Sequence, residues 1–225
     1  MIVFDEVTKS YPTRDGGRVT ILEDFSCAMP RGRNIGILGR NGAGKSTMMR
    51  LIAGSERPTR GEVYREGKVS WPLGFSGGFN PKLTGRQNLR FIARLYRENY
   101  EEIVDFVEDF AAIGKFMDEP MTNYSAGMRA RLTFGTSMAI PFDYYLIDEV
   151  IGVGDKAFRE RCAEVLAERR REATVLLVSH SSALLRQFCD IGGVLSDGTV
   201  TFFDTLEEAI ERHDENQKQL LIDSS

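Results

Sequence analysis

A glycine-rich segment that ends in Lys-Ser-Thr carries the clearest chemical pattern of the sequence. Residues 39–47 read GRNGAGKST and match G-x-x-x-x-G-K-[ST], between a strand-like and a helix-like stretch. Glycine lets consecutive amides turn inward toward phosphate oxygens, next to the positive end of the following helix dipole. Lys45 would bridge the β- and γ-phosphates of a nucleotide, and Ser46 would offer its hydroxyl to Mg²⁺. The predicted nucleotide contacts are Gly39, Asn41, Gly42, Ala43, Gly44, Lys45, Ser46 and Thr47. The alternative is a glycine-rich turn with an accidental Lys-Ser. The probability that the motif occurs by chance somewhere in a chain of this length is about one in a hundred.

Two carboxylates, Asp148 and Glu149, follow an apolar stretch at residues 144–147 that predicts a buried strand. Open α/β sheets bind their ligands at the carboxyl ends of the strands. Asp148 suits the Mg²⁺ shell, and Glu149 is the candidate to orient and polarise the water that attacks the γ-phosphate. The alternative is a solvated acidic strand end, but the phosphate loop upstream favours the catalytic interpretation.

The two histidines have different expected roles. His180 follows the apolar stretch 174–178, again at the end of a predicted strand. A histidine in that position often makes a structural hydrogen bond, but the phosphate loop favours a γ-phosphate contact. His213 falls in a polar helical tail and is predicted to lie on the surface.

Strand-like and helix-like stretches alternate along most of the chain, which predicts an α/β fold with a parallel sheet and crossover helices. The N-terminal region differs, because residues 2–7 and 19–29 predict an antiparallel hairpin around a turn at 15–17. Between about 84 and 139 apolar residues recur at helical spacing, which predicts a helical insert. The other expected elements are strands at 33–38, 144–147, 174–178 and 199–204, helices at 45–53 and 156–171, and a capping box at 205–208 that opens a polar helix.

Length and composition limit the classes of protein that the chain can belong to. Its 225 residues fit one domain, and we expect 1–225 to form it, with a core from 1–83 and 140–225 and a helical subdomain over about 84–139. A net charge of −4 argues against extended contact with nucleic acid. Three cysteines without a Cys-x-x-Cys pair indicate a reducing compartment, and argue against a disulfide framework or a zinc site. The sequence shows neither a signal peptide nor an apolar run of about 18 residues, so we expect a partner to hold the protein at any membrane.

A second glycine motif, Tyr-Ser-Ala-Gly-Met at 124–128, precedes another predicted helix. Ser125 by itself would be an ordinary N-cap. However, the order of phosphate loop, helical insert, Ser-x-Gly, Asp-Glu and His resembles the ATP-binding subunit of ABC transporters over essentially the whole chain. The resemblance implies a P-loop NTPase (ABC ATPase) core with a mixed sheet, an antiparallel β subdomain and a helical insert.

The resemblance also implies a site shared by two copies of the chain that face head to tail. Ser125 and the Gly127 amide of one copy would contact the γ-phosphate of the ATP held, with Mg²⁺, by Lys45 of the other. Tyr11 matches the aromatic residue that stacks on adenine in the family, although it could equally be a surface residue after a strand. Gly154-Asp155 matches a loop of the dimer interface. The Gln that the family usually carries near Phe75 is missing, so we assign no metal role there.

Local stretches narrow the resemblance. Residues 70–74 (SWPLG), 83–88 (LTGRQN), 124–129 (YSAGMR) and 142–149 (FDYYLIDE) together resemble the ATP-binding subunit of bacterial capsular polysaccharide exporters. This implies an ATPase at the cytoplasmic face of the inner membrane, bound to a separate transmembrane polysaccharide permease and a wider capsule export assembly. We expect the permease to dock in a groove between residues 75–80 and the helix near 89–95.

Three alternatives compete with this interpretation. Exporters of O-antigen or teichoic acid are similar, but many carry an added C-terminal domain, whereas this sequence stops about 20 residues after its last predicted strand. A soluble ABC ATPase that acts on DNA or ribosomes usually has two ATP sites or long coiled inserts, and the sequence shows neither. A nucleotide-binding regulator or scaffold that hydrolyses little ATP is disfavoured by Glu149.

Overall fold

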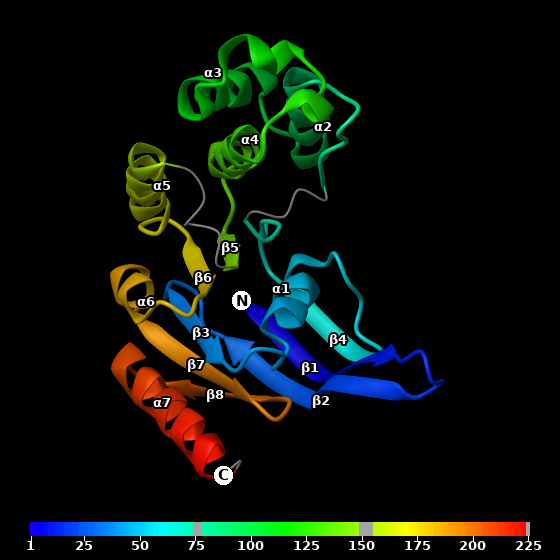
Figure 1. Cartoon of the computed structure of the whole chain (residues 1–225), viewed down its shortest axis with the longest axis vertical. Helices are drawn as coiled ribbons and strands as arrows, with labels where there is room; N and C mark the ends of the chain where they lie inside the picture. Colours follow the sequence, from blue (N-terminus) through cyan, green and yellow to red (C-terminus); the bar gives the residue numbers. More distant parts are fainter. Residues whose placement is uncertain (74–77, 149–154, 224–225) are drawn as a thin grey trace. The chain divides into compact units, whose positions relative to one another are not determined.

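The computed structural model describes residues 1–73, 78–148 and 155–223, which divide into two compact units. The sheet unit comprises Met1–Pro72, Asp143–Glu149 and Arg170–Ser225, and the helical unit comprises Leu73–Phe142 and Val150–Arg169 (Figure 1). None of the helices in the described ranges is both long and apolar enough to cross a membrane.

A five-stranded mixed sheet forms the centre of the sheet unit (Figure 1). Its order is β5-β6-β3-β7-β8; the first four strands are parallel and β8 pairs antiparallel with β7. The strands are β3 Ile35–Gly39, β5 Tyr144–Asp148, β6 Thr174–Val178, β7 Ile191–Ser196 and β8 Thr199–Phe203. The predicted α/β class with a mixed sheet is therefore confirmed.

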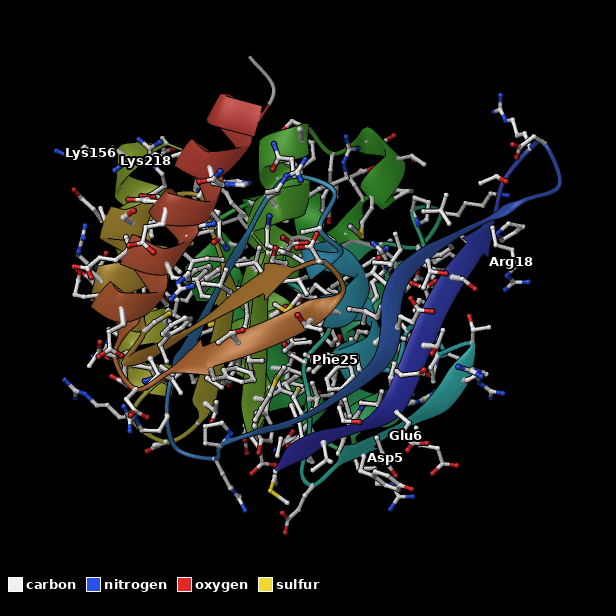
Figure 2. The ribbon with its side chains drawn as sticks, turned by 90° about the horizontal axis from the view of Figure 1, so that it is seen from below. Asp5, Glu6, Arg18, Phe25, Lys156 and Lys218 are labelled. Carbon is white, nitrogen blue, oxygen red and sulfur yellow. The ribbon has the colours of Figure 1, made fainter. Side chains whose placement is uncertain are left out.

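A second, antiparallel sheet of three strands has the order β2-β1-β4. Its strands are β1 Ile2–Pro12, β2 Arg18–Met29 and β4 Arg60–Arg65. The predicted hairpin is confirmed, with Arg18 beside its turn and Phe25 further along β2 (Figure 2). The first strand is longer than expected, so Tyr11 lies within β1 and does not follow it.

The core of the sheet unit fills the space between α1 (Lys45–Ala53) and the strands. The helices α6 (Ser182–Phe188) and α7 (Leu206–Asp223) complete this unit, and α7 packs against β7 and β3. The predicted capping box opens α7, since the Glu208 amide donates to Thr205 Oγ1 at 3.3 Å and the Thr205 amide to Glu208 Oε2 at 3.4 Å. Buried side chains of the core include Ile2, Phe4, Leu22, Ile35, Ile37, Met48, Met49, Tyr144, Leu176 and Val178.

Four α-helices of the helical unit are described: α2 Gly85–Tyr96, α3 Tyr100–Ala111, α4 Ala126–Ala139 and α5 Lys156–Arg169. Two 3₁₀ turns, η2 Gly114–Asp118 and η3 Met121–Asn123, join α3 to α4. The rings of Phe110, Phe134 and Phe158 pack together between α3, α4 and α5, and the centroid of Phe110 lies 5.7 Å from that of Phe134 and 5.4 Å from that of Phe158. The helical character expected for residues 84–139 is confirmed.

The three cysteine thiols are free and far from reactive. Cys162 and Cys189 are buried and Cys27 is partly buried. Burial raises the pKa of each of the three thiols to about 12.

Candidate nucleotide-binding site

The loop between β3 and α1 requires glycine at both of its ends. Gly39 has a φ of +153°, and a Cβ there would lie 2.6 Å from the carbonyl oxygen of Leu195. Gly44 has a φ of +104°, and a Cβ there would lie 2.3 Å from Cγ2 of Ile21. Both distances are far below ordinary contact, so any side chain at these positions would displace a neighbour.

The first turn of α1 presents backbone amides to the loop. Gly44 is the N-cap and has no side chain to cap the helix. The first intrahelical hydrogen bond runs from the Met48 amide to the Gly44 carbonyl, at 2.8 Å. The amides of residues 44–47 therefore lie in the helix turn that lacks intrahelical partners and carries a partial positive charge. This end of α1 can receive an anion such as a phosphate group.

Lys45 places its ammonium group directly over the loop. Its Nζ donates to the carbonyl oxygens of Gly39 at 2.6 Å and Arg40 at 2.8 Å, and the residue is only 7% exposed. The Ala43 amide donates to the Arg40 carbonyl at 3.2 Å, which closes the loop. The positive charge is thus held beside the amides that precede the helix.

A cavity of about 340 Å³ brings the phosphate loop together with the predicted carboxylate and histidine. Asp148 ends β5, and His180 comes two residues after β6; because β5, β6 and β3 are parallel, their carboxyl ends share one edge of the sheet. The cavity is lined by Ile21, Asn41, Gly42, Gly44, Lys45, Ser46, Thr47, Asp148, Val178 and His180. Of the predicted loop contacts, Gly39 and Ala43 do not line it.

The oxygen donors in this cavity fit Mg²⁺. The cavity holds the Ser46 hydroxyl and the Asp148 carboxylate. Among the described residues no group of three or more His, Cys, Asp or Glu side chains could hold a metal ion by itself. Mg²⁺ needs no such group, because it commonly binds one or two protein oxygens together with substrate phosphates and water.

Tyr11 joins β1 to α1 at the side of the loop. Its hydroxyl donates to Glu56 Oε2 at 2.8 Å and lies 3.4 Å from Thr47 Oγ1, while Arg50 Nη2 donates to the same Thr47 oxygen at 3.1 Å. The Lys9 ammonium lies 4.9 Å from the centroid of the Tyr11 ring. The aromatic residue therefore adjoins the last residue of the phosphate loop, although the two are far apart in the sequence.

Glu56 is the carboxylate that holds this cluster together. It pairs with Lys9 at 2.8 Å and with Arg50 at 3.0 Å, in addition to Tyr11. Burial alone would raise the pKa of Glu56, but the hydrogen bonds from Lys9, Tyr11 and Arg50 outweigh it and lower the pKa to about 2. The sequence offered no signal for this group, because its partners come from β1 and α1.

The second glycine motif starts α4 in the helical unit. Ser125 is the N-cap, and its Oγ accepts a hydrogen bond from the Met128 amide at 3.2 Å. A Cβ at Gly127 would have its nearest neighbour at 3.9 Å, so the backbone there is open. The predicted helix start is confirmed, and α4, like α1, begins with exposed backbone that suits an anion.

Asp155 is bound to two elements of the helical unit. Its Oδ1 accepts from the Phe158 amide at 2.9 Å, and its Oδ2 accepts from Arg131 at 2.6 Å. The hydrogen bond from the Phe158 amide is the largest cause that lowers the pKa of Asp155, and Arg131 lowers it further. The Arg131 guanidinium also lies 4.9 Å from the Phe158 ring centroid. No sequence signal marks Arg131, because its spacing on α4 does not reveal a partner near α5.

Glu149, the predicted catalytic carboxylate, lies outside the described residues, as do Gly154 and the segment around Phe75 where the family Gln is missing. Of the expected docking groove, the structure describes Phe79, which is 8% exposed, and α2, whose Phe91 and Leu95 are 52% and 60% exposed.

His213, which was expected on the surface, keeps partial exposure on α7. His213 is partly buried and lines a cavity with His180, because α7 packs along the sheet. The composition of α7 is polar, which suggests a solvated helix, but one face of it covers the edge of the phosphate loop.

Comparison with known proteins identifies the family. Residues 22–152 match the ABC transporter family. Over 211 residues the chain is 49% identical to the capsule polysaccharide export ATP-binding protein CtrD of Neisseria meningitidis serogroup B, covering 94% of this chain and 97% of that protein. It is 37% identical to the O-antigen export system ATP-binding protein RfbB of Klebsiella pneumoniae, covering 81% of this chain and 76% of that protein.

The fold also resembles a solved structure, the dimeric ATP-binding cassette MJ0796 bound to ADP and Pi. The TM-score is 0.77 at 22% identity, and the match covers 92% of this chain and 99% of that one. Family match, relatives and fold agree: the chain belongs to the ABC transporter family.

Proposed function

We propose that the chain is the ATP-hydrolysing subunit of an exporter of capsular polysaccharide. The observation that carries the ATPase is the cavity that gathers the phosphate loop, Asp148 and His180 at one sheet edge. The high identity to a capsule export protein over nearly the full length of both chains supports the substrate class. The lower identity and coverage of the O-antigen relative favour capsule over O-antigen.

In this proposal each predicted site residue has one task. The α1 amides and Lys45 bind the β- and γ-phosphates, and Tyr11 stacks on the adenine ring. Ser46 and Asp148 would hold Mg²⁺, which would supply positive charge against the phosphate oxygens. Glu149 orients the attacking water and His180 contacts the γ-phosphate, so that the reaction proceeds by positioning and charge stabilisation.

The proposal includes a second copy of the chain. Two copies face head to tail, and Ser125 and the Gly127 amide of each contact the γ-phosphate bound by the other. Because ADP lacks that phosphate, ATP favours the closed pair and ADP the open one. The segment 84–139 serves as the helical subdomain that carries Ser125 over the other copy's nucleotide.

The closing and opening of the pair then moves a transmembrane polysaccharide permease at the cytoplasmic face of the inner membrane. Phe91 and Leu95 lie one helical turn apart on α2, so their exposed side chains form one apolar face. An apolar helix face of this kind suits a short amphipathic helix from the permease.

The test of the ATPase is turnover by the purified chain and two variants. We expect Lys45→Ala to lower the rate at least about 100-fold, because it removes the charge that faces the γ-phosphate. The Glu149→Gln variant should also lose turnover, but it should still bind ATP and accumulate as a dimer. Size-exclusion chromatography with light scattering measures that dimer. Lys156→Ala, at a side chain that is 84% exposed, is the matched control. Wild-type turnover in Glu149→Gln would refute the role of Glu149.

The test of the substrate class is deletion of the gene. Loss of surface capsule with accumulation of glycan inside the cell is the expected result, restored by the wild-type chain but not by Lys45→Ala. Normal capsule together with loss of O-antigen would contradict the capsule assignment and leave the ATPase intact.

A further inference from the structure

A second cavity adjoins the nucleotide cavity and is lined on one side by α7. This α7 cavity, of about 360 Å³, lies between the segment 179–185 and one face of α7. It shares His180 with the nucleotide cavity, and it is lined by Gly39, whose carbonyl binds the Lys45 ammonium. The two cavities therefore meet at the residues that face the γ-phosphate in the proposed function.

The lining of the α7 cavity is rich in hydrogen-bond donors. Ser179 and Ser182 offer hydroxyls from the sheet side, and His213, Gln217 and Lys218 offer imidazole, amide and ammonium groups from α7 (Figure 2 labels Lys218). The side chains of His213 and Gln217 lie 3.0 Å apart, between His213 Nε2 and Gln217 Nε2. Donors from two elements thus converge on one space.

The charges of the cavity nearly balance near neutral pH. Asp214 lines the same cavity and opposes the charge of Lys218. Burial lowers the pKa of His213, Asp214 raises it in part, and Lys45 and His180 lower it further. The charged and titratable groups that face His213 are Asp214, Lys218, Lys45, His180, Arg40 and Asp197.

We propose that the α7 cavity binds inorganic phosphate, in contact with His213 and Lys218, as the ion leaves the γ-position after hydrolysis. A phosphate dianion would compete with Asp214 for the charge of Lys218, and it accepts hydrogen bonds from Lys218 and from the two imidazoles. Because the dianion favours the charged imidazole, its binding draws a proton onto His213. This inference rests on the proposed ATP hydrolysis, which is the source of the phosphate.

The chain contains only two histidines, so nuclear magnetic resonance can follow each imidazole separately. The full-length protein, labelled at histidine, would be titrated with sodium phosphate at constant ionic strength, with the two signals assigned from His180→Gln and His213→Gln. Saturable movement of the His213 signal is the expected result, with its titration midpoint raised by about one pH unit. Lys218→Ala should weaken the apparent phosphate affinity at least fivefold.

Two further variants locate the bound ion. Arg212→Ala removes a positive charge from the same helix at a residue that does not line the α7 cavity, and it should leave the phosphate response unchanged. Lys45→Ala disables the phosphate loop but should leave the saturable response of His213 intact. Loss of the phosphate response in Lys45→Ala would place the ion in the nucleotide cavity and overturn the proposal. The proposal would also be overturned if Lys218→Ala responded to phosphate as strongly as the wild type, or if the wild type responded to chloride as strongly as to phosphate.

This measurement needs no turnover, so it separates the two proposals. If the wild-type chain hydrolyses ATP but its His213 signal does not move when phosphate is added, the proposed phosphate subsite alone is overturned. A chain that binds phosphate at His213 but does not hydrolyse ATP would overturn the proposed ATPase, and with it the origin of the ion, but not the subsite.

Discussion

Two buried tyrosine hydroxyls differ in whether they have a hydrogen-bond partner. The Tyr124 hydroxyl donates to the Phe116 carbonyl at 2.6 Å, within the helical unit. The Tyr144 hydroxyl, in the core of the sheet unit, has no partner among the described residues. A buried polar group costs free energy unless it is paired, so these two hydroxyls have opposite effects on stability.

Replacing each tyrosine by phenylalanine tests that difference. We expect Tyr144→Phe to leave the free energy of unfolding unchanged or to raise it by up to about 1 kcal/mol, because it removes an unpaired hydroxyl. Tyr124→Phe should lower it by about 1 kcal/mol, because the Phe116 carbonyl loses its donor. Urea unfolding of both variants measures the two changes, and a larger loss in Tyr144→Phe than in Tyr124→Phe would contradict the assignment.

Glu56 gives the stability a defined dependence on acid pH. Its pKa is about 2 in the folded chain against 4.5 when unperturbed, so its contribution is complete above about pH 4.5 and disappears as the pH falls toward 2. The side chain is 20% exposed, and the shift corresponds to at most about 3–4 kcal/mol. We therefore expect Glu56→Gln to lower the free energy of unfolding at pH 7 by roughly 2 kcal/mol. In chemical denaturation the gap between the variant and the wild type should close between pH 4.5 and 2.5; a constant gap would exclude this linkage.

At the scale of elements, α2 has two apolar faces. Leu89, Ile92 and Ala93 are buried in the helical unit, whereas Phe91 and Leu95 face outward. Single exposed apolar residues are ordinary, but two on one helical turn form a continuous patch. This patch is the part of the expected docking groove that can be altered without disturbing the core.

Charges on the outer face of α2 test the docking proposal. Phe91→Asp and Leu95→Asp should each reduce co-purification with the permease at least fivefold and leave the ATPase rate of the isolated chain unchanged, because neither side chain belongs to the core. Arg94→Ala changes a neighbouring residue of the same helix and serves as the control. Phe79 is buried, so a charge there would also perturb the packing of the helical unit and would not test docking alone. Undiminished co-purification of both aspartate variants would rule out this face.

The elements that the sequence predicted are those with a local signal. The phosphate loop has glycines at fixed spacing, and α1 was predicted with the bounds that the structure shows, because Gly54 ends it at a φ of +70°. The strands β5 and β6 are continuous apolar runs, as buried parallel strands are. These features depend on neighbouring residues alone.

The elements without a local sequence signal depend on distant partners. The strand β4 is mostly exposed and charged, and it is a strand because it pairs with β1. The strand β7 contains Gly192 and Gly193, which weaken a strand pattern, yet it lies between β3 and β8. A Cβ at Gly192 would lie 2.3 Å from the Ala209 Cβ of α7, so close helix packing requires this glycine. The position of His213 beside the phosphate loop follows from the same packing, which no local pattern contains.

At the scale of the whole molecule, the proposed dimer makes two different demands on Ser125. Within one copy its hydroxyl caps α4, and in the dimer the same residue faces the γ-phosphate held by the other copy. A substitution that keeps the cap but adds negative charge separates these roles, since aspartate is as good an N-cap as serine.

The free energy of unfolding of Ser125→Asp should lie within about 0.5 kcal/mol of the wild-type value. In a Glu149→Gln background it should not form the ATP-dependent dimer, because its carboxylate would repel the γ-phosphate. Ser125→Ala should lose about 1 kcal/mol of stability instead. The matched control is Asn99→Asp, which keeps the cap of α3 and adds the same charge elsewhere. Light scattering with ATP measures the outcome, and a normal dimer in Ser125→Asp would contradict the head-to-tail arrangement.

The shielding of the three thiols has a practical consequence for observing such a dimer. Because burial raises the pKa of each native thiol to about 12, the thiolate is scarce at pH 7, so maleimide dyes would attach to these positions slowly. A cysteine introduced in place of the exposed Lys156 would react with these dyes much faster than the three native thiols. Fluorescent probes could therefore report the separation of two copies during a transport cycle without a cysteine-free background.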